Sequence, residues 1–346
     1  REKKNMTEPI EILLTLPFKD NLINELKDIS PRLNFNTKVA KTPEDIPDDT
    51  WQHIEILYTS TVLPKPEEAP KLRWIQFHWA GVDHVINEPI LHKTGITATT
   101  MSGVHGPQIA EYVLLMILAF SRHLNELRTL QERANWPENK VRWNEFTPIE
   151  LRNSTIGIVG YGSVGRQAAR ILNAFGAKVL ATKKDVMHPA DPGYALAETG
   201  DPEGNYVHRL YPPQAIKSML NECDFVIICV PKIAATENLI STSELSAMKT
   251  SAYLIDVSRG GIVDQKALIN ALKENIIAGA ALDVFAEEPL PSSNPLWKLP
   301  NVIITPHISG VSRHYDERAL DLFSENLHRY LTDTPLYNVI DPQKGY

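Results

Sequence analysis

Short apolar runs alternate with helical patterns from residue 155 to residue 305. The runs consist mostly of Val, Ile and Leu and lack the polar alternation of a strand with one solvated face. Runs of this kind are typical of parallel sheets covered on both faces, and repeated strand–helix–strand units predict an α/β fold with a doubly wound sheet. The predicted strands are Thr155–Val159, Ala177–Thr182, Phe225–Val230, Ala252–Val257, Ala278–Asp283 and Val302–Thr305.

The beginning of the chain carries a second, less regular set of predicted strands. They are Ile10–Leu16, Ile54–Thr59, Leu72–Phe77 and Ile96–Thr99, and loops rich in Pro, Asp and Glu separate them. The long pattern Gln108–Arg133 predicts one buried helix that crosses between two domains. Ser312–Thr332 predicts a last helix that returns to the first domain, and Asp185–Pro213 is expected to be a surface loop.

Length and composition limit the class of protein. The 346 residues suffice for roughly two domains, and a formal charge of −7 without a basic block argues against a nucleic-acid partner. No apolar run approaches the length of a membrane span. Two cysteines, Cys223 and Cys229, indicate buried thiols in a reducing compartment. We therefore expect a cytoplasmic protein with no metal, no disulfide scaffold and no membrane partner.

One glycine-rich motif directly follows a predicted strand and opens a predicted helix. It consists of Gly160, Tyr161, Gly162, Ser163, Val164 and Gly165. In such a motif the first glycine allows a tight turn, the second lets a pyrophosphate approach the backbone, and the third lets helix and strand pack closely. The free N–H groups of the helix N-terminus favour an anion. The motif therefore predicts a dinucleotide site.

The end of the next predicted strand bears on cofactor choice. Sites for NAD usually carry an acidic residue about 20 positions downstream, which binds the ribose 2′-hydroxyl. Here Thr182, Lys183 and Lys184 occupy that place, and the first acid is Asp185. Two ammonium groups and a hydroxyl suit a 2′-phosphate. NADPH is therefore favoured, with NADH as the alternative. We also assign residues at later strand ends to the cofactor site, namely Val230, Pro231, Val257 and Asp283.

Three polar residues follow three successive predicted strands. Arg259 lies in I-D-V-S-R-G-G, Glu287 and Glu288 lie in A-L-D-V-F-A-E-E-P, and His307 lies in N-V-I-I-T-P-H-I-S-G. The carboxyl ends of parallel strands meet at one edge of a sheet, where such folds bind ligands. Together these residues supply an arginine for a carboxylate, a histidine for a proton and an acid to set the charge of that histidine.

In combination and in this order, the motifs resemble the NAD(P)-dependent D-2-hydroxyacid dehydrogenase family. The segments that carry the resemblance are the glycine motif, L-R-W-I-Q-F-H-W-A-G-V-D-H, Q-I-A-E-Y-V-L-L, V-S-R-G-G, D-V-F-A-E-E-P and T-P-H-I-S-G. The resemblance implies two Rossmann-like domains, a split substrate domain formed by residues 1–110 and 311–346 and an inserted nucleotide-binding domain formed by residues 111–310.

The same resemblance assigns chemical roles. It implies that Arg259, Glu288 and His307 form the catalytic set, with Glu288 in the family's position directly before Pro289. It also implies that the loop Ala80, Gly81 and Val82 holds the substrate carboxylate through backbone amides. A protonated His307 would act as general acid while NADPH reduces the 2-oxo carbon, and Arg259 would bind the carboxylate of the 2-oxoacid.

Some alternatives stay open at this point. A formate dehydrogenase shares the architecture but has glutamine where Glu288 stands, and a dinucleotide-sensing corepressor keeps the same polar residues. The substrate side chain is undetermined, and Phe77, His78, Trp79, Met101 and His105 are either pocket residues or packing residues. The family implies a homodimer, with the Gln108–Arg133 helix at the interface. The segment Asp185–Pro213 looks longer than usual in the family, and covering the adenosine end of the cofactor is one role open to it.

Overall fold

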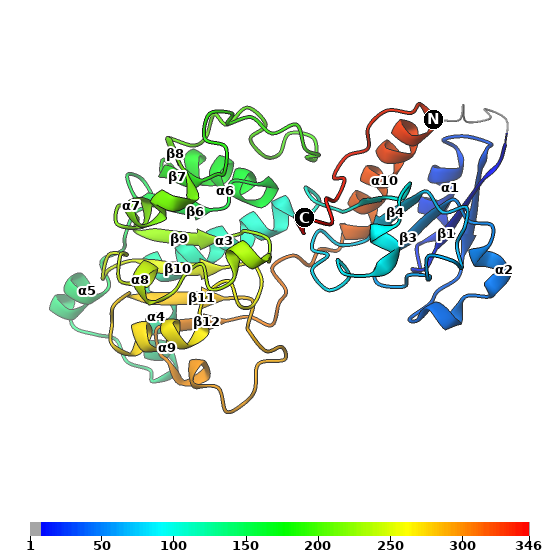
Figure 1. Ribbon diagram of the computed structural model, residues 1–346. Helices are drawn as coiled ribbons and strands as arrows, with labels where there is room; N and C mark the ends of the chain where they lie inside the picture. The colour runs from blue at the N-terminus through cyan, green and yellow to red at the C-terminus, as the bar shows by residue number, and fades with distance from the viewer. Residues whose placement is uncertain (1–7, 346) are drawn as a thin grey trace. The chain divides into compact units, whose positions relative to one another are not determined.

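The structure is a computed structural model that describes residues 8–345. These residues divide into two compact units, shown in Figure 1. The first unit contains the chain up to Val104 together with the chain from Ser312 onward, and the second unit contains His105–Val311. No helix within residues 8–345 is long and apolar enough to cross a membrane.

The first unit is built on a five-stranded parallel sheet with the order β2-β1-β3-β4-β5. Its strands are β1 (Ile10–Leu14), β2 (Leu33–Thr37), β3 (Ile56–Thr59), β4 (Trp74–Phe77) and β5 (Thr97–Thr99). Its helices are α1 (Asp20–Lys27), α2 (Asp48–Trp51) and α10 (Tyr315–Leu331).

Helix α10, the last helix of the chain, completes the core of the first unit. The ring of Phe323 is fully buried and lies 4.9 Å from the ring of Tyr58 and 5.2 Å from that of Trp74. The side chain of Asn326, also buried, bonds the backbone of Tyr337. The two ends of the described chain are therefore packed into one unit.

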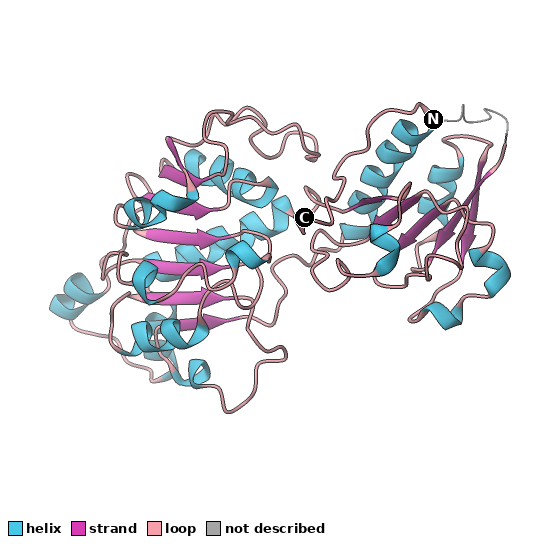
Figure 2. Ribbon diagram, in the orientation of Figure 1, coloured by secondary structure: helices cyan, strands magenta, loops and turns pink. Residues whose placement is uncertain are grey.

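The second unit is built on a seven-stranded parallel sheet, visible as a row of parallel arrows in Figure 2. Its order is β12-β11-β10-β9-β6-β7-β8. The strands are β6 (Thr155–Val159), β7 (Lys178–Thr182), β8 (Arg209–Tyr211), β9 (Phe225–Ile228), β10 (Tyr253–Asp256), β11 (Gly279–Leu282) and β12 (Val302–Ile304). The helices are α3 (Gly106–Ser121), α4 (Leu124–Glu132), α5 (Asn139–Glu145), α6 (Ser163–Ala174), α7 (Ile216–Leu220), α8 (Thr242–Leu245) and α9 (Gln265–Lys273).

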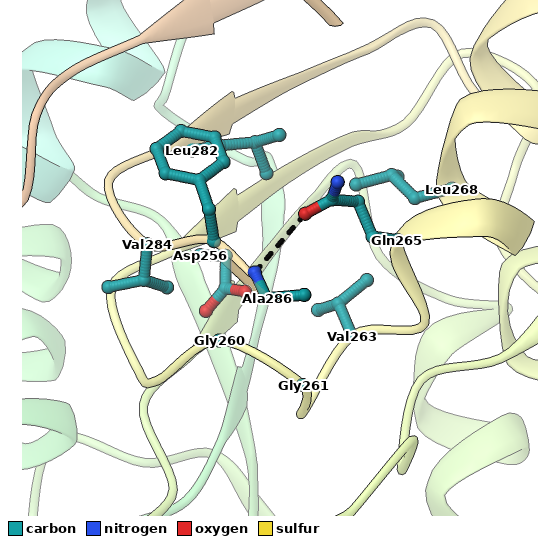
Figure 3. A pocket seen from close by; sticks show the side chains of 10 residues that line it. Asp256, Gly260, Gly261, Val263, Gln265, Leu268, Leu282, Val284 and Ala286 are labelled. Carbon is teal, nitrogen blue, oxygen red and sulfur yellow. Dashed lines mark hydrogen bonds between the residues drawn. The ribbon is translucent and has the colours of Figure 1, made fainter. Parts of the chain in front are cut away.

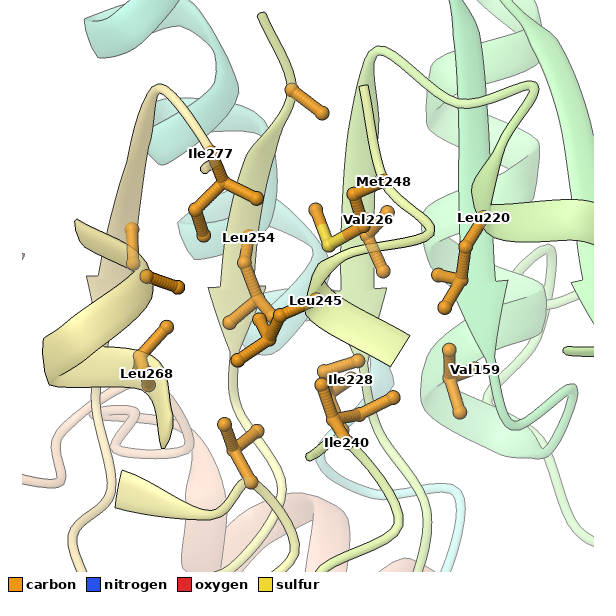
Figure 4. Close-up of a cluster of buried hydrophobic side chains, with 14 of the residues drawn as sticks. Val159, Leu220, Val226, Ile228, Ile240, Leu245, Met248, Leu254, Leu268 and Ile277 are labelled. Atoms are coloured by element: carbon orange, nitrogen blue, oxygen red, sulfur yellow. The ribbon is translucent and has the colours of Figure 1, made fainter. Parts of the chain in front are cut away.

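The unbroken apolar strands of this sheet are buried on both faces. In β9, Val226 and Ile228 belong to one hydrophobic cluster, whereas Phe225 and Ile227 belong to another. Because successive side chains of a strand point to opposite faces, a run with no polar alternation supplies two cores at once. Figure 4 shows part of the first cluster. This arrangement confirms the predicted doubly wound sheet.

Strand order in the second unit reverses between β6 and β9. From β6 the chain moves outward to β7 and β8, and then crosses back to add β9, β10, β11 and β12 on the other side. In open α/β sheets the carboxyl ends of the strands at such a switch point leave a crevice for ligands. The glycine motif follows β6 and therefore lies at that point.

Three features of the chain differ from the sequence-based expectation. The single helix predicted over Gln108–Arg133 is two helices, α3 and α4, both within the second unit. The break falls at His123, whose left-handed φ of 53° ends the first helix. The strand β8 lies inside the predicted loop Asp185–Pro213, and β2 was not predicted. Both are edge strands in which most residues are half-buried or exposed, LNFNT in β2 and RLY in β8, so neither shows a continuous apolar run.

Candidate active site

The glycine-rich turn between β6 and α6 has the shape that a pyrophosphate requires. Gly160 has a φ of +106°, and a Cβ there would lie 2.7 Å from Val230. At Gly165 a Cβ would lie 2.3 Å from the carbonyl oxygen of Gly160. At Gly162, by contrast, a Cβ would meet nothing within 4 Å. The turn is thus tightly packed at Gly160 and Gly165 and open at Gly162, which lies at the N-terminus of α6. This shape fits the phosphates of a dinucleotide.

The end of β7 fixes this turn from inside the sheet. The hydroxyl of Thr182 accepts a hydrogen bond from the N–H of Gly160 at 3.1 Å, and its carbonyl accepts one from the N–H of Tyr161 at 3.0 Å. Thr182 is buried. The structure therefore places Thr182 beneath the turn, where its hydroxyl supports the backbone.

The two lysines after β7 lie in different environments. The Lys183 ammonium donates to the carbonyl oxygens of His188 and Ala190, and the residue is half-buried. Lys184 is exposed. Asp185, the first acid, bonds the imidazole of His188 at 2.7 Å. Of the two predicted phosphate ligands, Lys184 is the more exposed.

Other predicted cofactor residues lie at the ends of β9 and β10. Val230 is half-buried against Gly160, Pro231 is exposed just after it, and Val257 is buried at the end of β10. Ser163 and Val164 form the first turn of α6 and are half-buried. All of them belong to the second unit, along the carboxyl edge of its sheet.

The loop after β10 carries Arg259 and is held by a buried carboxylate. Asp256 accepts hydrogen bonds from the N–H of Ser258 at 3.0 Å and from its hydroxyl at 2.5 Å. Arg259 in turn donates from Nη1 to the carbonyl of Ser258 at 2.9 Å. Burial, with a smaller effect of the neighbouring Asp283 carboxylate, raises the pKa of Asp256 to about 7.

A small pocket lies under this loop, and Figure 3 shows Asp256 and Gly260 on its wall. Gly260 is required there, because a Cβ would lie 1.7 Å from the carbonyl oxygen of Phe285. The close approach joins the loop after β10 to the loop after β11. The N–H of Ala286 donates to Gln265 across the same pocket at 3.2 Å.

Asp283, at the end of β11, organises the loop that carries His307. Its carboxylate accepts from the hydroxyl of Thr305 at 2.6 Å and from the N–H groups of Ile308 and Ser309 at 2.9 Å each. Thr305 also bonds the hydroxyl of Tyr112 at 2.7 Å, and burial raises the pKa of Tyr112 to about 12. The chain is therefore fixed both before His307, at Thr305, and after it, at Ile308 and Ser309.

His307 and Glu288 are brought together by their loops. The Nδ1 atom of His307 lies 2.7 Å from Oε2 of Glu288, whose Oε1 accepts from the N–H of Phe285 at 2.9 Å. His307 has a left-handed φ of 52°, a conformation uncommon outside glycine and costly unless its surroundings hold it. The side chains remain 44% and 34% exposed. The imidazole is thus oriented through one nitrogen while staying accessible.

The predicted carboxylate loop belongs to the first unit, at the carboxyl end of β4. Ala80 and Gly81 are half-buried and Val82 is buried. Beside the loop, Trp79 is 42% exposed and stacks on Tyr315 with ring centroids 5.3 Å apart.

The other candidate pocket residues divide between packing and exposure. Phe77 and Met101 are buried in the core of the first unit, and His78 is buried against the hydroxyl of Tyr58 at 2.9 Å. His105 is half-buried in the second unit. Phe77 and Met101 therefore pack the core, and Trp79 is the exposed member of the set.

Sequence reasoning missed the residues that support the site. Asp256, Ser258, Tyr112 and Thr305 hold the loops of Arg259 and His307. A polar residue at the end of an otherwise apolar strand, such as Asp256 after Leu254 and Ile255, is a signal that could have identified the first of them.

Comparison with known proteins gives one consistent result. Residues 114–309 match the model of the D-isomer specific 2-hydroxyacid dehydrogenase NAD-binding domain. A glyoxylate reductase of Thermofilum pendens is 36% identical over 263 residues, covering 75% of this chain and 72% of that protein. A glyoxylate reductase of Pyrococcus furiosus is 34% identical over 327 residues, covering 92% and 91%.

The fold is shared with solved structures. The crystal structure of a D-isomer specific 2-hydroxyacid dehydrogenase from Xanthobacter autotrophicus Py2, in complex with NADPH and MES, is 23% identical and has a TM-score of 0.77. The match covers 98% of this chain and 100% of that one. The chain described here belongs to the D-isomer specific 2-hydroxyacid dehydrogenase family and is an NAD(P)-dependent oxidoreductase that acts on 2-oxoacids and 2-hydroxyacids.

Proposed function

We propose that this enzyme reduces a small 2-oxoacid to the D-2-hydroxyacid with NADPH, and that His307 is the general acid. The observation that carries the proposal is the 2.7 Å contact between His307 Nδ1 and Glu288. A carboxylate at Nδ1 holds a proton on that nitrogen and leaves Nε2 to exchange a proton with substrate. The similarity to glyoxylate reductases makes glyoxylate the first substrate to test.

The chain's own residues prepare the site for this reaction. Arg259, presented by the Asp256–Ser258 support, offers a planar fork that suits a carboxylate and polarises the adjacent carbonyl. We propose that the backbone amides of Ala80, Gly81 and Val82, in the first unit, bind a substrate carboxylate. Asp283 keeps the loop of His307 in place. The imidazole of His307 would therefore give its proton from a fixed position.

The cofactor is proposed to occupy the glycine-rich turn, with its phosphates at Gly162 and the N-terminus of α6. When bound, it supplies the hydride. We propose a preference for NADPH over NADH, supported by the exposed Lys184 and by the lack of an acidic side chain at the end of β7.

The alternative functions have less support. The contact of Glu288 with His307 suits proton donation to a ketone, and formate oxidation requires no such proton. A dinucleotide-sensing corepressor would keep the same geometry without turnover. Steady-state oxidation of NADPH in the presence of glyoxylate, hydroxypyruvate and bulkier 2-oxoacids tests the proposal directly, since only a 2-oxoacid reductase consumes both substrates.

Replacing His307 with Gln should lower kcat for oxoacid reduction by about 100-fold or more, because the amide of Gln cannot give the proton that the imidazole is proposed to donate. The dissociation constant for NADPH should change little. Glu288→Gln should also lower kcat, whereas Glu287→Gln, at the exposed neighbouring acid, serves as the matched control and should resemble the parent. Near-normal turnover of the His307 variant would remove this residue from the mechanism.

Two glycine substitutions should separate cofactor binding from folding. Gly162→Ala adds a methyl group where the apoprotein has open space, so its melting temperature should match that of the parent. The same methyl group blocks the approach of the pyrophosphate, and NADPH affinity measured by cofactor fluorescence should fall about tenfold or more. Gly165→Ala should instead lower the melting temperature, because its Cβ collides with backbone. Unimpaired cofactor binding by Gly162→Ala would contradict the proposed site.

Cofactor preference should depend on Lys184 more selectively than on Lys183. An exposed charge contributes about 0–1 kcal/mol, so Lys184→Ala should reduce kcat/KM with NADPH up to about fivefold and leave kcat/KM with NADH unchanged. Raising the salt concentration should weaken the parent's preference in the same direction. Lys183→Ala should affect both cofactors alike, because the Lys183 ammonium is bonded to its own loop. Equal use of NADH and NADPH by the parent at low salt would refute the preference.

We also propose that the enzyme is a homodimer. Large apolar side chains are exposed along α3, α4, α5 and the connection between α4 and α5, namely Leu115, Leu124, Leu127, Trp136 and Trp143. A grouping of this kind on one stretch of chain is typical of a surface covered by a partner. Light scattering after gel filtration should give twice the chain mass of 38.9 kDa. Leu124→Glu with Leu127→Glu should lower that mass, whereas Val39→Glu, at an exposed apolar residue of the first unit, should not. A monomeric parent would contradict the proposal.

A further inference from the structure

Residues 185–208, called the strap below, form a compact loop between β7 and β8. Its two arms are joined by a hydrogen bond from the N–H of Asp191 to the carbonyl of Pro202 at 2.8 Å. They pack so closely that a Cβ at Gly204 would lie 2.7 Å from the side chain of Pro189. The strap is therefore a defined structure rather than an open connection.

The first attachment of the strap is Arg166, in the first turn of α6. Its side chain is only 3% exposed. The guanidinium donates to the carboxylate of Asp191 at 3.2 Å and to the carbonyls of Pro189 at 2.6 Å and Asp201 at 2.5 Å. It also lies over the ring of Tyr161, 4.6 Å from the centroid. A charge this deeply enclosed is costly unless it is fully bonded, and the strap provides every one of these oxygens.

The second attachment is the carboxylate of Asp201, which is 2% exposed. It accepts hydrogen bonds from the N–H groups of Asn205 at 2.7 Å and Tyr206 at 2.9 Å, which fold the strap itself. It also accepts one from the hydroxyl of Tyr161 at 2.5 Å. Tyr161 is the residue between the first two glycines of the turn. One buried carboxylate therefore links the fold of the strap to the phosphate-binding turn.

Two further contacts fix the strap to the same region. The N–H of Gly200 donates to Gln167 of α6 at 2.5 Å. At the other end, the ammonium of Lys183 is bonded to the carbonyls of His188 and Ala190. The strap is thus attached to the turn, to the start of α6 and to the end of β7, which are the three elements that the proposed dinucleotide would contact.

We propose that the strap preorganises the glycine-rich turn for the dinucleotide, and that Asp201 is the positioning residue that couples the two through Tyr161. Thr182 bonds the backbone of the turn at Gly160, and the strap bonds the side chain of the turn at the Tyr161 hydroxyl. A turn fixed before the cofactor arrives does not lose its freedom on binding, so the affinity is higher than that of a loose turn with the same contacts. This inference rests on the proposed use of the turn for NADPH.

The test compares Tyr161→Phe and Asp201→Ala with Glu203→Gln, which changes an exposed acid of the same strap. Tyr161→Phe removes only the hydroxyl, and Asp201 keeps its two backbone donors, so the strap should stay folded. The dissociation constant for NADPH is measured by fluorescence, and the order of residues 185–208 in the apoprotein is measured by hydrogen exchange.

Tyr161→Phe should weaken NADPH binding about three- to tenfold while exchange within residues 185–208 stays as slow as in the parent. Asp201→Ala should weaken binding about tenfold or more and also speed that exchange. Glu203→Gln should match the parent in both measurements. If Asp201→Ala is too unstable to isolate, Tyr161→Phe alone decides.

Unchanged NADPH affinity in Tyr161→Phe would overturn the inference, because the strap would then be a cover without influence on the turn. Unchanged exchange in Asp201→Ala would overturn it as well, since Asp201 would not hold the strap. A parent that binds neither NADPH nor NADH would instead refute the proposed cofactor site, and a parent that binds while all variants bind equally would refute only the role of the strap.

Discussion

Parallel strands that end at one edge are the constraint on which the functional part of this protein depends. In the second unit every strand runs in the same direction, so the loops after β6, β9, β10, β11 and β12 all emerge together. The chain places its glycine turn, Arg259, Glu288 and His307 in those loops. Burial of apolar side chains on both faces of the sheet determines where the strands end. A polar residue that directly follows a strand in the sequence therefore lies at this edge.

Buried carboxylates hold the loops at that edge in place. Asp283 takes three donors from the His307 loop, and Asp256 takes two from the residue before Arg259. Asp201 does the same for the strap. Each carboxylate bonds N–H groups of its own or a neighbouring loop, and a loop that satisfies a buried acid has few other conformations available. The proposed catalytic residues Glu288 and His307 stay partly exposed, whereas the supporting Asp256 and Asp283 are buried.

Much of this could be predicted from the sequence, and the exceptions have physical reasons. The apolar strands and the residues after them were predictable, because burial on both faces leaves a continuous Val/Ile/Leu run. The break at His123 was not, since one residue in a left-handed conformation interrupts a pattern that remains apolar on either side. The hydrogen bonds of the Lys183 ammonium could not be predicted either. They go to backbone carbonyls of His188 and Ala190, and every residue has a backbone carbonyl, so the sequence does not show which ones are used. The roles of Arg259, Glu288 and His307 remain predictions.

The position of α10 has a consequence for the order in which the protein forms on the ribosome. The sheet of the first unit is synthesised early, but Phe323, which covers Tyr58 and Trp74, belongs to the last helix. The second unit, a continuous segment, has all its strands before that helix is made. Domains fold as units during synthesis, so the second unit can close while the first still exposes an aromatic surface. During that interval the rings of Tyr58 and Trp74 lack the cover that Phe323 later provides, and transiently exposed apolar surface of this kind favours aggregation.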